Sequence, residues 1–215
     1  MQKKDVLIVS GGHLDKELLR CVLARRQYYI IAADRGADYL LDIGVVPDLA
    51  VGDFDSADNG VREALRQKTR LKEYNPRKDY TDTHIAVSEA LLLCPDHIVI
   101  LGATGGRIDH LLGNIELLYA CRKQGVEAVI LDENNKIRVI DNQLKIKKEM
   151  QYGRYISCIP FTESVKGLTI TGFEYNLEAE SIYKGQTIGI SNELREEEGC
   201  ITVGQGCLIV METKD

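Results

Sequence analysis

The chain has 215 residues, of which 44% are hydrophobic and 28% are charged, a composition typical of an ordinary soluble globular protein. Its length allows one large domain or two small ones, with ample residues to bury a core. The formal net charge of −6 argues against a nucleic-acid-binding protein, because such proteins normally carry a basic face. An acidic protein can still bind a polyphosphate when a metal ion and local arginines supply positive charge.

The six cysteines form no C-x-x-C pair and have no histidine at the spacing of a zinc site. Cys21, Cys94 and Cys121 fall in apolar stretches, where a free thiol packs as a small hydrophobic group. These features predict a reduced, cytoplasmic chain. No apolar run approaches the roughly 20 residues that span a bilayer, and no signal peptide precedes the first predicted strand, so we expect no membrane partner.

Short apolar runs alternate with helical patterns through the first part of the chain. The first run, at residues 5–10, is continuously apolar, which is typical of a strand buried on both faces of a parallel sheet. The alternation predicts a βαβ series, and hence an α/β fold with an open, mainly parallel, Rossmann-like sheet and helices on both faces. The predicted strands are 5–10, 28–33, 49–51, 71–74, 98–101 and 128–131, and the predicted helices are 14–26, 37–43, 61–67, 81–93 and 111–124.

The pattern changes after about residue 135. From Lys136 onward, short alternating runs are separated by turn residues, and no convincing amphipathic helix lies among them. This arrangement predicts a C-terminal antiparallel β-sandwich, so we expect two domains, 1–135 and 136–215. The predicted strands here are 137–140, 144–146, 155–159, 168–171, 187–190, 201–203 and 208–211.

Charged residues and glycines follow four consecutive predicted strands. They are Asp34-Arg35-Gly36, then Asp53 with Asp55, then the stretch 75–82, and finally the stretch 102–110. Ligands of open α/β sheets bind beyond the carboxyl ends of the strands, so these residues predict a site on one rim of the sheet.

Asp53 and Asp55 form the most acidic part of this rim. If their segment is extended, both carboxylates point to one face, about 7 Å apart along the chain. No lysine or arginine lies nearby to neutralise them. They form either a solvated acidic turn or part of a site for a divalent cation, and hard oxygen ligands favour Mg²⁺.

Asp82 lies at the start of the predicted helix 81–93 and has two interpretations. It is either an N-cap or a third carboxylate facing Asp53 and Asp55. Asp79, Thr81 and Thr83 are alternative caps, so Asp82 is not required for capping. Lys78 lies close by in sequence and can neutralise part of a polyphosphate.

The glycine-rich stretch Gly102–Gly106 lies between a predicted strand and a predicted helix, which is the context of a phosphate-binding loop. It matches neither a Walker A motif nor a G-x-G-x-x-G fingerprint. Arg107 strengthens the prediction, because a guanidinium group is a planar, bidentate donor for phosphate. Asp109 and His110 either cap the helix, or orient Arg107 and contact a nucleotide.

These motifs taken together resemble the thiamine pyrophosphokinase family. In order, they are Asp34-x-Gly36-Ala37, Pro47-Asp48, Gly52-Asp53-Phe54-Asp55-Ser56, Asp79-x-Thr81-Asp82 and Gly105-Gly106-Arg107-x-Asp109-His110. The C-terminal part is similar through Gly172–Leu177 and Ser191-Asn192. The resemblance covers most of the chain.

The resemblance implies an enzyme that transfers the pyrophosphoryl group of ATP to the hydroxyl of thiamine, and that works as a homodimer. It implies a catalytic Mg²⁺ site at Asp53, Asp55 and Asp82, and thiamine contacts at Ser191, Asn192 and Tyr175. Tyr175 occupies an aromatic position in its motif, and the chain has no tryptophan to fill that role. The implied ATP site consists of Asp34, Arg35, Gly36, Lys78, Asp79, Thr104, Gly105, Gly106, Arg107, Asp109 and His110.

Other functions remain open from the residues. The same chemistry could serve another hydroxymethyl heterocycle, such as a pterin. A silent nucleotide-binding regulator would need no three-carboxylate metal site, so the presence of Asp53, Asp55 and Asp82 argues against it. A Mg²⁺-dependent phosphohydrolase would release phosphate or pyrophosphate without an acceptor.

Overall fold

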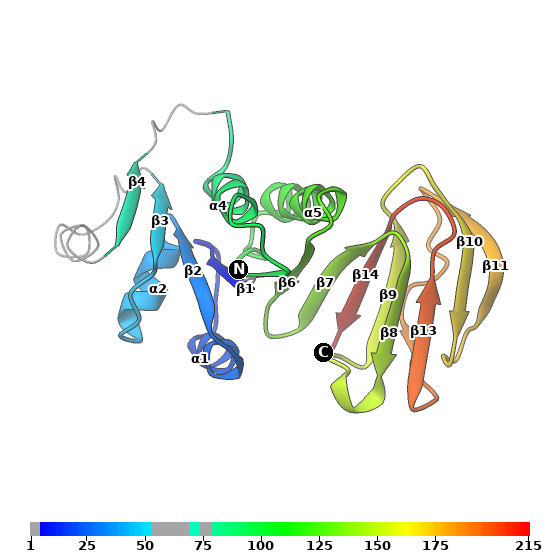
Figure 1. Cartoon of the computed structure of the whole chain (residues 1–215). Coiled ribbons are helices and arrows are strands. Elements are labelled where there is room, and N and C mark those ends of the chain that lie inside the picture. Colours follow the sequence, from blue (N-terminus) through cyan, green and yellow to red (C-terminus); the bar gives the residue numbers. More distant parts are fainter. Residues whose placement is uncertain (1–4, 53–68, 74–78) are drawn as a thin grey trace. The chain divides into compact units, whose positions relative to one another are not determined.

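The computed structural model describes residues 5–52, 69–73 and 79–215 (Figure 1). The chain divides into two compact units, Met1–Glu133 and Asn134–Asp215. Asp53, Asp55 and Lys78 lie outside the described residues, as does the predicted helix 61–67. Among the described residues, the helices are all too short or too polar to cross a membrane.

The N-terminal unit contains a parallel sheet with the strand order β6-β5-β1-β2-β3-β4. The predicted α/β class with a mainly parallel sheet is therefore confirmed. The strands are β1 (Asp5–Val9), β2 (Tyr28–Ala33), β3 (Leu49–Gly52), β4 (Arg70–Glu73), β5 (His97–Leu101) and β6 (Glu127–Leu131). The helices are α1 (Lys16–Arg25), α2 (Gly36–Asp42), α4 (Asp82–Leu91) and α5 (Ile108–Lys123).

Strand β1 lies at the centre of this sheet, between β2 and β5. Its apolar residues Val6 to Val9 are fully buried, which explains why the strand has no polar alternation. The chain proceeds from β1 to β2 and β3 on one side, and returns to β5 and β6 on the other. The order of strands therefore reverses at β1, and such a reversal opens a crevice at the carboxyl ends of the two neighbouring strands.

The helices of this unit form two groups (Figure 1). Helices α1 and α2 lie together, and Lys16 Nζ of α1 donates to Asp42 Oδ2 of α2 at 2.9 Å. Helices α4 and α5 are in contact with each other and cover the opposite side of the strands. Asp15 begins α1 by accepting a hydrogen bond from the Leu18 N–H at 2.8 Å. Both groups of helices cover apolar side chains of the strands, as expected for a βαβ series.

The C-terminal unit is built from two sets of antiparallel strands, in the orders β12-β9-β14-β7 and β11-β10-β13-β8. Their apolar faces share one core that includes Val165, Leu168, Ile201 and Leu208, all fully buried. The predicted antiparallel C-terminal sheet region is therefore confirmed. The elements are β7 (Asn135–Ile140), β8 (Gln143–Lys147), η1 (Lys148–Met150), β9 (Tyr155–Pro160), β10 (Ser164–Thr171), β11 (Leu177–Tyr183), β12 (Asn192–Glu193), β13 (Glu198–Thr202) and β14 (Leu208–Thr213).

One predicted strand is wrong, and two strands were not predicted, β11 and the two-residue β12. Residues 187–190 alternate in hydrophobicity but lie in turns, where Ile188 and Ile190 are 52% and 45% exposed. The left-handed backbone of Gly189 (φ 92°) and Ser191 (φ 56°) breaks an extended conformation there. Of the two missed strands, β11 carries mostly exposed side chains and is held by its backbone pairing with β10. Its sequence therefore lacks a strong apolar pattern.

A buried carboxylate joins three segments of the C-terminal unit. Glu212 on β14 has only 2% of its side chain exposed, and its Oε1 lies 2.6 Å from Arg138 Nη2 and 3.2 Å from Lys136 Nζ. Both cations come from β7, the neighbouring strand. The other oxygen, Oε2, accepts a hydrogen bond from the Tyr152 N–H at 2.8 Å. Both oxygens of the carboxylate therefore have charged or hydrogen-bonding partners, which a buried carboxylate requires.

The substitution Glu212→Gln is expected to lower the free energy of unfolding by about 3 kcal/mol, because it leaves two cations without their buried anion. Urea denaturation of the full chain measures this loss. Glu198→Gln is the matched control: it removes a carboxylate that accepts from Lys145 Nζ at 2.9 Å but is 39% exposed. It should cost less than about 1 kcal/mol. Equal losses in the two variants would contradict the buried cluster.

Candidate functional site

A cavity of about 320 Å³ lies at the rim of the N-terminal sheet, at the reversal of strand order. The carboxyl ends of β1, β2 and β5 and the first turns of α4 and α5 contribute to it. It is lined by Ser10, Gly11, Gly12, Ala33, Asp34, Thr81, Asp82, Thr83, Gly102, Ala103, Gly105, Gly106, Arg107, His110 and Asn114. The rim predicted from the strand ends therefore contains a real concavity.

Two glycine-containing turns that line this cavity are in close backbone contact, one after β1 and one after β5. The Gly12 N–H donates to the Gly102 carbonyl at 2.9 Å, and the Ser10 N–H donates to the Leu101 carbonyl at 2.8 Å. A Cβ on Gly12 would lie 2.4 Å from the Gly102 oxygen. Gly102 has φ +66°, and a Cβ there would lie 2.4 Å from the Ser10 oxygen. Only glycine permits this close approach of the two backbones.

Sequence reasoning did not assign a site to the β1 end. Ser10, Gly11 and Gly12 line the cavity, as do Thr83 and Asn114. A usable signal was present, since two glycines directly follow a fully buried strand, as in many phosphate-binding turns. Thr83 and Asn114 carry no comparable signal, because hydroxyl and amide residues are common within helices.

The loop after β5 carries an ion pair beside the cavity. Arg107 lines the cavity, and its Nε and Nη2 donate to the two carboxylate oxygens of Asp109 at 3.2 and 2.5 Å. The hydrogen bond from Arg107 lowers the pKa of the Asp109 carboxyl. The same bond raises the pKa of the Arg107 guanidinium. Of the two roles considered for Asp109, orienting Arg107 therefore fits this geometry.

The start of α4 places Asp82 at the cavity without using it as a cap. Thr81 is the N-cap, and its side chain accepts a hydrogen bond from the His84 N–H at 3.2 Å. The Ser10 and Thr83 hydroxyls are 3.0 Å apart, and this hydrogen bond joins the first turn of α4 to the end of β1. Asp82 lies between Thr81 and Thr83 in the chain and lines the cavity.

The turn after β2 separates its three predicted site residues. Asp34 lines the cavity, with a left-handed backbone (φ 49°) held by its N–H bond to the Val51 carbonyl at 2.8 Å. Gly36 is buried instead against β1, and a Cβ there would lie 1.8 Å from the Val9 oxygen. Glycine at this position is therefore required by packing.

The predicted ATP residues thus fall into three groups. The cavity brings together Asp34, Gly105, Gly106, Arg107 and His110. It is not lined by Arg35, Gly36, Asp79, Thr104 or Asp109. Lys78 lies outside the described residues.

A metal site is only partly within the described residues. Asp82 and Asp34 supply two carboxylates to the cavity wall, and oxygen ligands of this kind suit Mg²⁺. Across residues 5–52, 69–73 and 79–215, no group of three or more acidic, histidine or cysteine residues is placed to hold a metal ion. Asp53 and Asp55 lie outside those ranges, so the three-carboxylate site stays a prediction.

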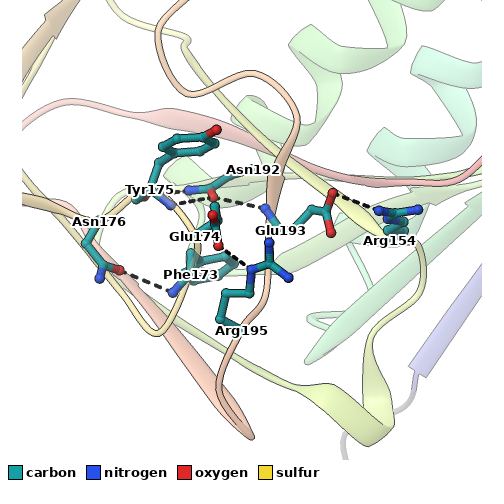
Figure 2. A network of polar contacts seen from close by, with 8 residues as sticks. All are labelled: Arg154, Phe173, Glu174, Tyr175, Asn176, Asn192, Glu193 and Arg195. Atoms are coloured by element: carbon teal, nitrogen blue, oxygen red, sulfur yellow. Dashed lines mark hydrogen bonds and ion pairs between the residues drawn. The ribbon is translucent and has the colours of Figure 1, made fainter.

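Two of the residues predicted for thiamine, Tyr175 and Asn192, lie next to each other in the C-terminal unit (Figure 2). Asn192 is buried, and its side-chain amide bridges the backbone of Tyr175: Oδ1 accepts from the Tyr175 N–H at 3.0 Å, and Nδ2 donates to the Tyr175 carbonyl at 2.7 Å. The Tyr175 side chain is left 70% exposed. The Ser191 N–H donates to Ser157 Oγ at 3.0 Å.

Ion pairs flank Tyr175 and Asn192 (Figure 2). Arg154 Nη2 donates to Glu193 Oε1 at 3.1 Å, and Arg195 pairs with Glu174. The Asn192 amide thus orders the backbone around Tyr175, and an exposed aromatic ring is presented from an ordered turn. Such a ring can stack on a planar cation.

The fold and the cavity define a class of protein: an α/β domain with a glycine-lined, acidic site at the strand ends, followed by an antiparallel β-sandwich. Residues 22–130 match the model of the thiamin pyrophosphokinase catalytic domain, and residues 141–208 match that of the thiamin pyrophosphokinase vitamin B1 binding domain. The chain belongs to the thiamine pyrophosphokinase family. The resemblance inferred from the motifs is therefore confirmed.

Individual relatives agree with this assignment. The thiamine pyrophosphokinase of Bacillus subtilis (strain 168) is 41% identical over 216 residues, which cover 99% of this chain and 100% of that protein. The crystal structure of the Bacillus subtilis protein superposes with a TM-score of 0.88 at 36% identity, covering 99% of this chain and 100% of that one. The structure from Geobacillus thermodenitrificans has a TM-score of 0.84 at 33% identity, covering 98% of each chain.

Gly36→Ala is expected to lower the free energy of unfolding by about 2–4 kcal/mol, because the new methyl group meets the Val9 carbonyl on the central strand. The control is Gly113→Ala in α5, where a Cβ meets nothing within 4 Å. That change should be neutral or stabilise by up to about 1 kcal/mol. Thermal unfolding of both variants measures the contrast, and similar unfolding temperatures would show that β1 and α2 are not in close contact.

The Asp109 carboxyl should titrate below the usual range of an aspartate, because Arg107 stabilises its charged form. The ion pair is then intact at neutral pH and is lost as the pH falls through that lowered pKa. Side-chain NMR titration of the full chain measures it. Arg107→Gln should move the Asp109 pKa upward, whereas Arg20→Gln, which removes a different exposed pair on α1, should leave it unchanged. No movement in Arg107→Gln would show that the pair does not form in solution.

Proposed function

We propose that this chain transfers the β,γ-pyrophosphoryl group of ATP to the hydroxyl of thiamine, giving thiamine diphosphate and AMP. As a member of its family it is a thiamine diphosphokinase, an ATP-dependent enzyme. The observation that carries the proposal is the 41% identity to a thiamine pyrophosphokinase over the full length of both chains. The glycine-lined cavity at the strand ends supports the proposal, because glycine turns of this kind suit phosphate binding.

In the reaction, the thiamine hydroxyl oxygen forms a bond to the β-phosphorus, and the bond from that phosphorus to the α,β-bridging oxygen breaks. The hydroxyl proton is lost, and AMP departs with the α-phosphate. Arg107 and the Gly102–Gly106 loop would hold the phosphates, because guanidinium and backbone N–H groups are donors suited to anionic oxygens and both line the cavity. Positioning and electrostatic stabilisation supply most of the acceleration in such transfers.

The carboxylates Asp53, Asp55 and Asp82 are proposed as the catalytic residues and the ligands of Mg²⁺. Bound there, the metal ion would offset the negative charge that develops on the phosphate oxygens. Asp82 supports this role because Thr81 caps α4 in its place and leaves its carboxylate at the cavity wall. Asp55 and Asp82 are both candidates to accept the proton of the thiamine hydroxyl.

The division of labour between the domains is also a proposal. Residues 1–135 would bind ATP and Mg²⁺, and residues 136–215 would bind thiamine and form a homodimer in the cytoplasm. The match of residues 141–208 to a vitamin B1 binding domain supports a thiamine role for Ser191, Asn192 and Tyr175. The homodimer is what the resemblance to the family implies.

Incubation of the full chain with ATP, thiamine and Mg²⁺ tests the function, with products identified by mass. Equal amounts of thiamine diphosphate and AMP are expected. Consumption of a pterin alcohol in place of thiamine would instead assign a different heterocycle as acceptor. Release of phosphate or pyrophosphate without an acceptor would indicate a phosphohydrolase, and nucleotide binding without any product would indicate a regulator.

Asp82→Asn and Asp53→Asn are each expected to reduce turnover by several orders of magnitude, because each removes a charge that the developing transition state depends on. Thermal unfolding should change little for Asp82→Asn, since the Thr81 cap is retained. The control is Asp42→Asn, which removes only the exposed pair with Lys16 and should keep full turnover. Near-normal AMP release by Asp82→Asn would remove that residue from the metal site.

A further inference from the structure

Asn114 is a buried amide in the wall of the cavity. It lies on α5, its residue is only 7% exposed, and its Nδ2 donates to the Ala103 carbonyl oxygen at 2.9 Å. A carbonyl oxygen can only accept, so the amide nitrogen must face Ala103 and the orientation of the amide is fixed. Asn114 thereby holds the turn that begins at Gly102, the left-handed glycine in contact with the β1 end.

The fixed orientation directs the amide oxygen, Oδ1, away from Ala103. Within residues 5–52, 69–73 and 79–215, no group donates a hydrogen bond to this oxygen. Oδ1 is not among the enclosed atoms that lack a partner, so it is open to the cavity, where water or a ligand can donate to it. The side chain lines the cavity, so a ligand bound there can supply the missing donor.

We propose that Asn114 is a specificity-determining residue, whose Oδ1 accepts a hydrogen bond from an O–H or N–H group of the nucleoside part of the nucleotide. The inference rests on the proposed function to the extent that ATP occupies this cavity. Phosphate oxygens are acceptors at neutral pH and have no proton to offer Oδ1, whereas ribose hydroxyls and the adenine amino group do. The acceptor therefore selects the nucleoside and not the polyphosphate.

The polar groups of the cavity divide into donors suited to phosphate and acceptors suited to the nucleoside. Arg107 is a donor suited to phosphate, whereas Asp34 is an acceptor at the carboxyl end of β2. An acidic residue in that position of dinucleotide-binding folds accepts from ribose hydroxyls. The Ser10 and Thr83 hydroxyls are bonded to each other and can rotate, whereas the Asn114 amide offers the nucleoside an acceptor of fixed orientation.

The test compares ATP with three analogues that each lack one donor: 2′-deoxyATP, 3′-deoxyATP and the triphosphate of the purine riboside without the 6-amino group. Dissociation constants are measured by calorimetry on the full chain, and KM and kcat with thiamine and Mg²⁺. For the wild type, one analogue should bind roughly 10- to 100-fold more weakly than ATP, because the donor that this analogue lacks is the one that pairs with Oδ1. Binding of all three within about twofold of ATP would overturn the inference without any variant.

The substitution Asn114→Leu removes the acceptor at similar volume. It should weaken ATP binding and abolish the preference over that one analogue, with the change in KM rather than in kcat. Asn114→Asp keeps an oxygen acceptor but loses the Ala103 tether, so it should unfold at a lower temperature and keep the preference. A preference unchanged in Asn114→Leu would assign the residue a structural role only.

Glu116→Gln is the control on the same helix. Glu116 is exposed and does not line the cavity, so this variant should retain the wild-type preference among the nucleotides. The two proposals fail separately in these measurements. Discrimination that depends on Asn114 without AMP release would refute the enzymatic proposal alone, and AMP release without that dependence would refute only the assignment of Asn114.

Discussion

The candidate site depends on the close approach of two backbones, at the ends of β1 and β5. The Gly12 N–H bonds to the Gly102 carbonyl, and neither glycine can carry a side chain without meeting the opposing oxygen. This contact brings together turns that are about ninety residues apart in sequence. The cavity opens where the strand order reverses, because the connections from these two strands leave in opposite directions.

Hydrogen bonds from the surrounding helices hold the cavity wall in place. Ser10 with Thr83 ties α4 to β1, and Asn114 ties α5 to the Gly102 turn. Helix α4 is capped by the side chain of Thr81, and the next residue, Asp82, lines the cavity. These polar contacts join residues that are close in space but lie on different elements. Each fixes the position of a group that the chemistry of a thiamine pyrophosphokinase can use.

The C-terminal unit uses buried polar groups in a comparable way. The Asn192 amide is hydrogen-bonded to the backbone of Tyr175. Glu212 pairs with two cations of β7 and accepts a backbone N–H from the loop before β9. Sequence inspection gave the antiparallel class but not every strand. Residues 187–190 alternate in hydrophobicity and yet form turns, whereas β11 is exposed at most positions and is held by backbone pairing with β10. Side-chain pattern is a weak guide where backbone hydrogen bonds decide.

The sequence by itself determined the α/β class, the antiparallel C-terminal region, the family, and the rim on which Asp34, Asp82 and Arg107 lie. Apolar periodicity and ordered motifs are local properties, so they can be seen before the chain folds. Only the tertiary structure showed that Gly11-Gly12 and Asn114 line the same cavity, that Gly36 serves packing against Val9, and that Thr81 rather than Asp82 caps α4. The reason is physical: these roles are set by distances between segments that are remote in sequence, and no local pattern encodes such distances.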